Sequence, residues 1–225
     1  EIPLQFDGAG DFAEGLAPVA KGIYFGFIDP GGQWAIQPEF DAASSFSEGL
    51  AAVQIGEKWG YIDKSGVLAI TPQYDRAGTF RNAIAPVWQE DHWGLIGRNG
   101  QLLLEPQFES PAGGMAGEFF NGMATVVQDE RYGFINAEGA LLVPPRYTFA
   151  GDFGDDRAPV ELHGRYGYIN PQGDLVIKAG FQDAGVFSNG LAQVKNKGLW
   201  GYIGTDGVWR IPPRYQAALP FRAGL

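Results

Sequence analysis

The side chains best suited to catalysis are few in this sequence and lie far apart. Its two histidines, His92 and His163, are 71 residues apart, and neither stands in the ligand or carboxylate pattern that a metal site or a general base needs. There is no cysteine, which excludes disulfides, thiolate metal sites and cysteine nucleophiles. Neither the phosphate-loop pattern nor the Gly-x-Ser-x-Gly serine elbow occurs. We therefore expect no catalytic residue, no metal site and no cofactor, and we predict that the chain is not an enzyme.

Acidic side chains occur as three adjacent pairs, Glu90-Asp91, Asp129-Glu130 and Asp155-Asp156. Neighbouring residues point to opposite faces of a strand, so such a pair does not form an acid and base couple by itself. We interpret them as solvated turn charges, with a glycosidase pair assembled across the chain left as an alternative. Asp29 and Asp63 begin Asp-x-x-Gly sequences that lack the dense oxygen ligands of a calcium site, so they indicate tight turns.

The elements that position these side chains follow from an internal repeat. An aromatic residue precedes glycine six times, at spacings of 34, 34, 39, 34 and 34 residues. An Ala-x-Val block lies upstream of each pair, an Ile follows each aromatic by three residues, and a further Gly follows that Ile by four. The six pairs are Phe25-Gly26, Trp59-Gly60, Trp93-Gly94, Tyr132-Gly133, Tyr166-Gly167 and Trp200-Gly201.

Fixed glycines, recurrent prolines and short β-branched or aromatic runs predict that each repeat consists of strands. In the second repeat we expect strands over 50–54, 58–62 and 67–70, with a turn over 63–66 closed by Gly66. The strand over 58–62 should be central, and its glycine should leave room for a neighbouring aromatic. Pro18, Pro86 and Pro159 suggest that the first strand is an edge in their repeats.

The segment Lys58-Trp59-Gly60-Tyr61-Ile62-Asp63, followed by Gly66, Pro72 and Tyr74-Asp75, resembles the bacterial WG, or KWG, β-repeat family. The resemblance covers essentially the whole chain, although several repeats place Phe or Tyr where the family has Trp. It implies a β-rich repeat architecture and brings no catalytic motif with it.

We predict an all-β fold over residues 1–225, a single array of six hairpin units with partial terminal units and a five-residue insertion near 109–115. Each repeat of about 34 residues should contribute three short antiparallel strands. Stacking as an open β-superhelix is the first expectation, because a further block, an aliphatic residue followed four residues later by Phe or Tyr, occurs seven times and the other blocks six times. Its aromatics are Phe6, Phe40, Tyr74, Phe108, Tyr147, Phe181 and Tyr215. A six-bladed propeller-like ring is the alternative.

The chain is acidic, with a net charge of −10. This charge argues against nucleic acid and anionic membrane surfaces, and it favours a neutral ligand or a protein partner with a basic surface, of which we expect the protein partner. No run of 18 apolar residues occurs, so no membrane span is predicted. Because the chain begins at Glu1, we expect a periplasmic or otherwise exported bacterial protein whose signal peptide has been removed, with a cytoplasmic location as the alternative.

Positions that are constant among the repeats should build the stack, and positions that vary are free for recognition. Trp59, Trp93 and Trp200 are constant and are expected in the core, whereas Trp88 stands at a varied position. The loop between the first and second strands varies most. The predicted contact residues are Trp88, Glu90, Asp91, His92, Asp129, Glu130 and Arg131, together with Pro111 and Met115 of the insertion.

These features predict a non-enzymatic protein-binding scaffold, in a narrower form an inhibitor or immunity protein that caps a secreted bacterial toxin. The alternative is a cell-envelope carbohydrate-binding module that uses its aromatic side chains.

Overall fold

The described chain is built from short β-strands. The structure, a computed structural model, describes residues 5–110, 119–120 and 122–221. No helix occurs among these residues, and so none of them forms a helix that could cross a membrane. The chain divides into two compact units, Glu1–Gln107, named unit 1, and Phe108–Leu225, named unit 2.

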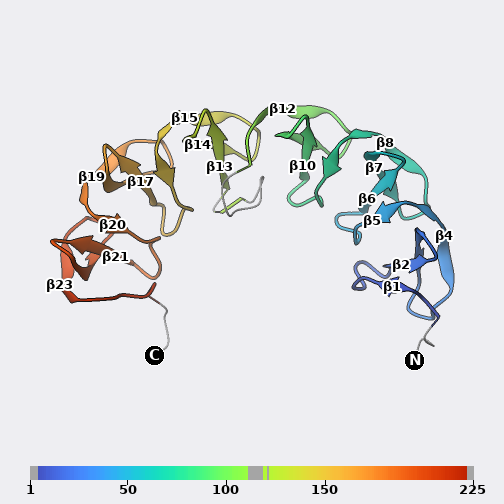
Figure 1. Cartoon of the computed structure of the whole chain (residues 1–225), viewed down its shortest axis with the longest axis horizontal. Coiled ribbons are helices and arrows are strands. Elements are labelled where there is room, and N and C mark those ends of the chain that lie inside the picture. The colour runs from blue at the N-terminus through green and yellow to red at the C-terminus, as the bar shows by residue number, and fades with distance from the viewer. Residues whose placement is uncertain (1–4, 111–118, 121, 222–225) are drawn as a thin grey trace. The chain divides into compact units, whose positions relative to one another are not determined.

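Unit 1 holds three antiparallel sheets in succession, one for each repeat, and each sheet follows chain order (Figure 1). The first contains β1 (Gly8–Ala9), β2 (Ala17–Lys21), β3 (Tyr24–Ile28) and β4 (Trp34–Phe40). The second contains β5 (Ala42–Ala43), β6 (Leu50–Ile55), β7 (Lys58–Asp63) and β8 (Leu68–Tyr74). The third contains β9 (Arg76–Ala77), β10 (Ile84–Gln89), β11 (His92–Gly97) and β12 (Leu102–Phe108), whose last residue belongs to unit 2.

Unit 2 repeats this plan in three further sheets. The first contains β13 (Met123–Gln128), β14 (Arg131–Asn136) and β15 (Leu141–Tyr147). The second contains β16 (Phe149–Ala150), β17 (Ala158–Leu162), β18 (Arg165–Ile169) and β19 (Leu175–Phe181). The third contains β20 (Asp183–Ala184), β21 (Leu191–Asn196), β22 (Leu199–Gly204) and β23 (Trp209–Tyr215).

Five of these sheets have a fourth strand of two residues that the sequence did not predict. In the second sheet, Ala42 and Ala43 pair with Gln54 and Val53 of β6. The first long strand is therefore an inner strand, and the expectation that it is an edge in the proline-containing repeats is wrong. Proline fits in this inner strand because the hydrogen bond to the short strand uses the proline carbonyl oxygen and not an N–H group. The Gly10 N–H donates to the Pro18 carbonyl oxygen at 2.8 Å.

The glycine that follows each aromatic faces the backbone of the third strand, and the expected aromatic ring lies beside it at Gly201, where a Cβ would be 2.8 Å from the Trp209 ring. A Cβ on Gly60 would lie 2.5 Å from the Ile70 carbonyl oxygen and 2.6 Å from the Pro72 nitrogen. Between Trp59 and Tyr61, β8 advances from Tyr74 to Ile70, so it carries a bulge at this point. Glycine is therefore required because the bulged third strand crosses directly over it.

The turn over 63–66 forms as predicted. Gly66 has a φ of 85°, and its N–H donates to the Asp63 carbonyl oxygen at 3.0 Å. Asp63 Oδ1 accepts the N–H groups of Ser65 and Val67, and the hydrogen bond from Ser65 lowers the pKa of this carboxyl. A Cβ on Gly66 would also lie 3.2 Å from Ile36 of the preceding sheet, so this glycine serves both the turn and the contact between repeats.

The core lies between successive sheets within each unit. In unit 1, buried Tyr61 and Ile70 of the second sheet pack with Phe80 and Val87 of the third repeat. The rings of Tyr61 and Phe80 meet edge to face, with centroids 4.9 Å apart, and the Tyr61 hydroxyl donates to the Gly78 carbonyl. Burial raises the pKa of Tyr61. Each sheet is thus stabilised by its neighbour along the chain.

The constant tryptophans are not equally buried. Trp93 is fully buried, as expected, whereas Trp59 and Trp200 are only half-buried. Trp59 packs at the margin of the cluster that contains Tyr61. The expectation that all three lie in the core is therefore correct for Trp93 alone. Trp59 and Trp200 each lie opposite the aromatic residue that ends the third strand, Tyr74 and Tyr215 respectively.

Candidate partner-binding loops

The loops that join the first and second long strands are two-residue hairpin turns in every repeat. From the third repeat onward both residues have positive φ, at 49° and 64° for Glu90 and Asp91 and at 50° and 58° for Asp129 and Glu130. Glycine or asparagine adopts this conformation at the least energetic cost. The middle repeats nevertheless place acidic residues there, and these loops project exposed carboxylates. The loops are Gly22-Ile23, Gly56-Glu57, Glu90-Asp91, Asp129-Glu130, His163-Gly164 and Lys197-Gly198.

The backbone of these loops is held by a recurrent side-chain bond that the sequence analysis missed. In five of the six loops, the residue after the repeat's Phe or Tyr accepts the N–H of the first loop residue, whereas Thr148 in the fifth repeat donates to the Glu161 carbonyl oxygen instead. Asp41 Oδ2 receives Gly56 N at 2.7 Å, and Asp75 Oδ2 receives Glu90 N at 2.9 Å. Asp7, Glu109 and Gln182 make the same bond in other repeats. The signal was present, because an acid or amide follows these aromatics at the repeat spacing.

In unit 1 the predicted contact residues gather around Arg76 of the short strand β9. Its guanidinium lies over the Trp88 ring, 5.1 Å from the centroid, and 4.0 Å from Asp91. The neighbouring Asp75 forms an ion pair with Lys58, whose hydrogen bond lowers the pKa of the Asp75 carboxyl. Trp88 is half-buried, and one ring face is occupied by a cation, so this face is not free to stack on a sugar.

His92 is exposed at the start of β11. Its Nδ1 lies 2.9 Å from the Glu90 carbonyl oxygen, so the ring is held against the turn. Among the described residues there is no group of three or more histidine or carboxylate side chains that could hold a metal ion. The histidine therefore belongs to the loop surface with Glu90 and Asp91.

In unit 2, Asp129 and Glu130 form the exposed turn between β13 and β14, and Arg131 is the exposed first residue of β14. Glu109 Oε1 accepts the Asp129 N–H at 3.3 Å. Pro111 and Met115, the predicted contact residues of the insertion, lie outside the described residues. The candidate residues thus form two local groups, one in each unit.

A second row of turns precedes the first long strands and was also missed. In the five of these turns that the structure describes in full, a residue with positive φ is followed by glycine or another residue with positive φ, as at Glu14-Gly15 and Glu48-Gly49. The sequence signal was a glycine four residues before the valine of the Ala-x-Val block in most repeats. These turns contact one another from repeat to repeat, because Ala83 N donates to Glu48 Oε2 at 2.8 Å and Gly190 N to Asp155 Oδ2 at 2.6 Å.

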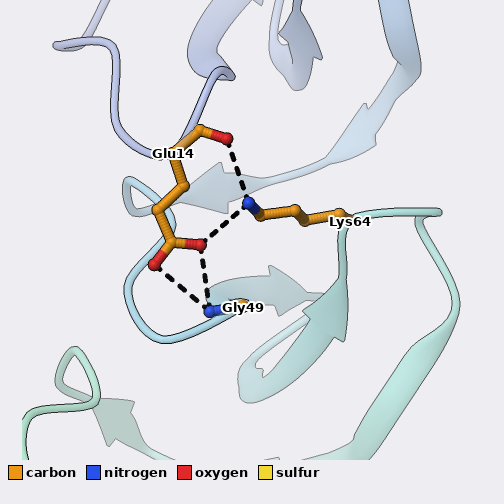
Figure 2. A network of polar contacts seen from close by, with 3 residues as sticks. All are labelled: Glu14, Gly49 and Lys64. Atoms are coloured by element: carbon orange, nitrogen blue, oxygen red, sulfur yellow. Dashed lines mark hydrogen bonds and ion pairs between the residues drawn. The ribbon is translucent and has the colours of Figure 1, made fainter.

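Figure 2 shows the most complete of these contacts, in which Glu14 joins two repeats. Its carboxylate accepts the Gly49 N–H, at 3.0 Å for Oε2, and pairs with Lys64 Nζ at 3.0 Å. The same Nζ donates to the Glu14 carbonyl oxygen at 3.0 Å. The hydrogen bond from Lys64 lowers the pKa of Glu14. This row of turns therefore connects repeats, while the loops between first and second strands face solvent.

Comparison with solved structures finds matches of low sequence identity. A eukaryotic initiation factor structure is 13% identical with a TM-score of 0.50, and the match covers 84% of this chain and 59% of that one. The chain thus spans less than two thirds of that structure. BamB from Moraxella catarrhalis is 12% identical with a TM-score of 0.46, covering 87% and 69% of the two chains. Hsv2p from Kluyveromyces lactis is 13% identical with a TM-score of 0.42, covering 85% and 71%.

Comparison with protein families gives a match along nearly the whole sequence, whereas comparison with curated proteins gave no match. The family model for the WG containing repeat matches seven segments, namely residues 2–22, 25–59, 59–91, 93–132, 132–166, 166–200 and 200–225. The segments have the spacing of the repeats but are offset from the sheets, because all but the first begin at the aromatic residue of a second long strand. The glycine that follows this aromatic residue is the one that the bulged third strand crosses. The chain therefore belongs to the WG containing repeat family.

Proposed function

We propose that this chain is a non-enzymatic protein-binding scaffold that recognises a basic partner protein through its row of strand-joining loops. One observation carries the proposal. The loop backbones are held by the same side-chain bond in several repeats, from Asp41, Asp75 and their equivalents, while the loop side chains differ between repeats. A fixed backbone that presents varied, exposed side chains is what a repeat array needs for recognition.

The charge of the loops gives the chemistry of the partner. Glu90 and Asp91 are exposed, as are Asp129 and Glu130, and the whole chain has a net charge of −10. Exposed charges of one sign accelerate the encounter with a partner of opposite sign. A narrower form of the proposal is an inhibitor, such as an immunity protein that caps a secreted bacterial toxin, acting outside the cytoplasm. It is supported by this acidity and by a sequence that lacks known catalytic motifs.

The test begins with capture of the partner from the native organism and continues with association kinetics. We expect Glu90→Lys with Asp91→Lys, or Asp129→Lys with Glu130→Lys, to slow association about tenfold at low salt, because rim charges act on the encounter rate. Raising the salt concentration should bring mutant and wild type together. Lysine is compatible with the turn, because Lys197 adopts a φ of 50° at the position equivalent to Glu90.

The matched control is Asp11→Lys with Glu138→Lys, which changes the charge equally at exposed acids outside these loops. The control should associate at the wild-type rate. Equal slowing in control and loop variants would show that only overall charge matters. Capture of a neutral glycan whose binding ignores salt would contradict the proposal in favour of a carbohydrate-binding module.

A further inference from the structure

The outer edge of each sheet is its third long strand, and this edge has a regular exposed side. The order of every sheet ends on β4, β8, β12, β15, β19 or β23. In all six strands the second, fourth and sixth residues are exposed, while the third and seventh are mostly buried. The second, fourth and sixth residues of these strands are named the outer positions of each unit.

The outer positions change sign between the two units. In unit 1 they include Glu39 and Glu105 and no cation, and in unit 2 they include Arg146, Lys178, Arg210 and Arg214 and no acid. The change occurs at equivalent places in the repeat: Glu39 of β4 corresponds to Arg146 and Arg214, and Glu105 of β12 corresponds to Lys178. Whole-unit composition changes in the same direction. Residues 1–107 contain 14 acidic and 6 basic residues, and residues 108–225 contain 12 and 10.

Exposed aliphatic side chains begin these strands in both units. At the outer positions themselves, Leu103 is 38% exposed in unit 1, and Leu142 is 37% and Val176 43% exposed in unit 2. The exposed first residues Leu68, Leu102 and Leu141 lie on the other face of their strands. Exposed apolar rows of this kind on soluble proteins mark association surfaces. Within unit 2 the spacing of the row is fixed, because the turn glycine Gly173 packs against Val143 of the preceding strand.

Prolines restrict how these edges can be used. Pro72 and Pro106 lie in the third strands of unit 1, and Pro144-Pro145 and Pro212-Pro213 in those of unit 2. A strand that contains proline cannot offer a continuous row of N–H donors to an added strand. Association at these edges therefore has to use side chains. The sign of each side-chain charge then directly affects which surface can bind there.

We propose that the outer positions of unit 2 dock against the outer positions of unit 1 of a second copy of this chain. The chain itself supplies both complementary surfaces: acidic outer positions with Leu103 in unit 1, and basic outer positions with Leu142 and Val176 in unit 2. Opposite charges at equivalent repeat positions fix the pairing and disfavour contacts between two like units. This docking is independent of the strand-joining loops, which remain available for another protein.

The experiment measures the mass of the full chain by sedimentation equilibrium over a range of concentrations, at low and high salt. Wild type should form dimers that weaken as salt rises. Lys178→Glu with Arg214→Glu should weaken the dimer at least about tenfold, and so should Glu39→Lys with Glu105→Lys. Mixing these two variants should restore dimers, because each then carries the complement of the other.

The matched control is Arg165→Glu with Lys197→Glu, which makes the same charge change in unit 2 away from the outer positions. It should dimerise as wild type does. A wild type that stays monomeric at all concentrations would overturn the proposal. It would also be overturned if the monomeric wild type sedimented with phosphatidylserine vesicles, because the basic positions would then serve an anionic membrane surface. Weakening by the control equal to that of the test variants, or no rescue on mixing, would overturn it as well.

Discussion

At the scale of single residues, glycine decides the local structure of each repeat. The six family glycines face the backbone of the third strand at 2.3–2.6 Å from where a Cβ would lie. A β-carbon essentially never approaches backbone atoms so closely, and here the neighbouring atoms belong to a strand that is itself fixed by the core. The position before the glycine accepts different aromatic residues, because Phe25, Trp59 and Tyr132 all lie half-buried at the equivalent place of their repeats.

We therefore expect Gly60→Ala to destabilise the protein by about 3 kcal/mol, measured by denaturant unfolding, because the bulge in β8 must move away. Gly180→Ala is the control. Its Cβ would meet only the Lys178 carbonyl oxygen at 3.9 Å, so it should be near neutral. Equal losses of unfolding free energy for the two variants would show that the bulge in β8 can move at little energetic cost.

At the scale of elements, short turns do two separate jobs. Turns before the first strands join neighbouring repeats through carboxylates such as Glu14, Glu48 and Asp155. Turns between the first and second strands are held from behind by Asp41, Asp75 and their equivalents and present their side chains to solvent. The two rows have similar backbone conformations and similar acidic composition, and only their partners distinguish them.

The Glu14 contact predicts a pH dependence of stability. Its pKa is lowered from 4.5 by Lys64, so the ionised carboxylate stabilises the folded state at neutral pH. This contribution is present above the unfolded pKa of about 4.5 and is lost as pH falls through the lower folded value. Glu14→Gln should cost about 0.5–1 kcal/mol at pH 7, and the difference from wild type should shrink below pH 4.5.

The control for this prediction is Glu57→Gln, which changes an exposed acid in a strand-joining loop. Its unfolding free energy should follow that of wild type at each pH. A loss for Glu14→Gln that stays constant down to pH 3 would mean that the carboxylate charge is not the stabilising feature.

At the scale of the whole molecule, stability comes from sheets that pack on their neighbours in the chain. Four buried clusters each join two consecutive repeats, as Tyr61 and Phe80 show. In such arrays stability is close to a sum over repeats and nearest-neighbour contacts, so damage remains local.

Phe80→Ala should thus cost about 3–5 kcal/mol by emptying a fully buried site between two sheets. Amide hydrogen exchange should accelerate in β5–β8 and β9–β12 and remain unchanged in β20–β23 of unit 2. Phe187→Ala, at the equivalent position of unit 2, should accelerate exchange in β16–β19 and β20–β23 and leave exchange in β5–β8 unchanged. Loss of protection throughout the chain in either variant would show that the array unfolds as one cooperative body.

The sequence by itself determined the repeat, its all-β character, the turn at Gly66 and the family. These follow from periodic residue types, because the same local backbone recurs wherever the same turn and strand residues recur. It also separated constant from varied positions, although burial then divided Trp93 from Trp59 and Trp200.

Only the tertiary structure decided which groups lie opposite one another. The short strand β5, the backbone over Gly60, the Glu14 contact with Gly49 and Arg76 over Trp88 each join residues that are distant in sequence or on different strands. Residue types state what a side chain can do, whereas strand register and the packing of one sheet on the next determine the partner it meets.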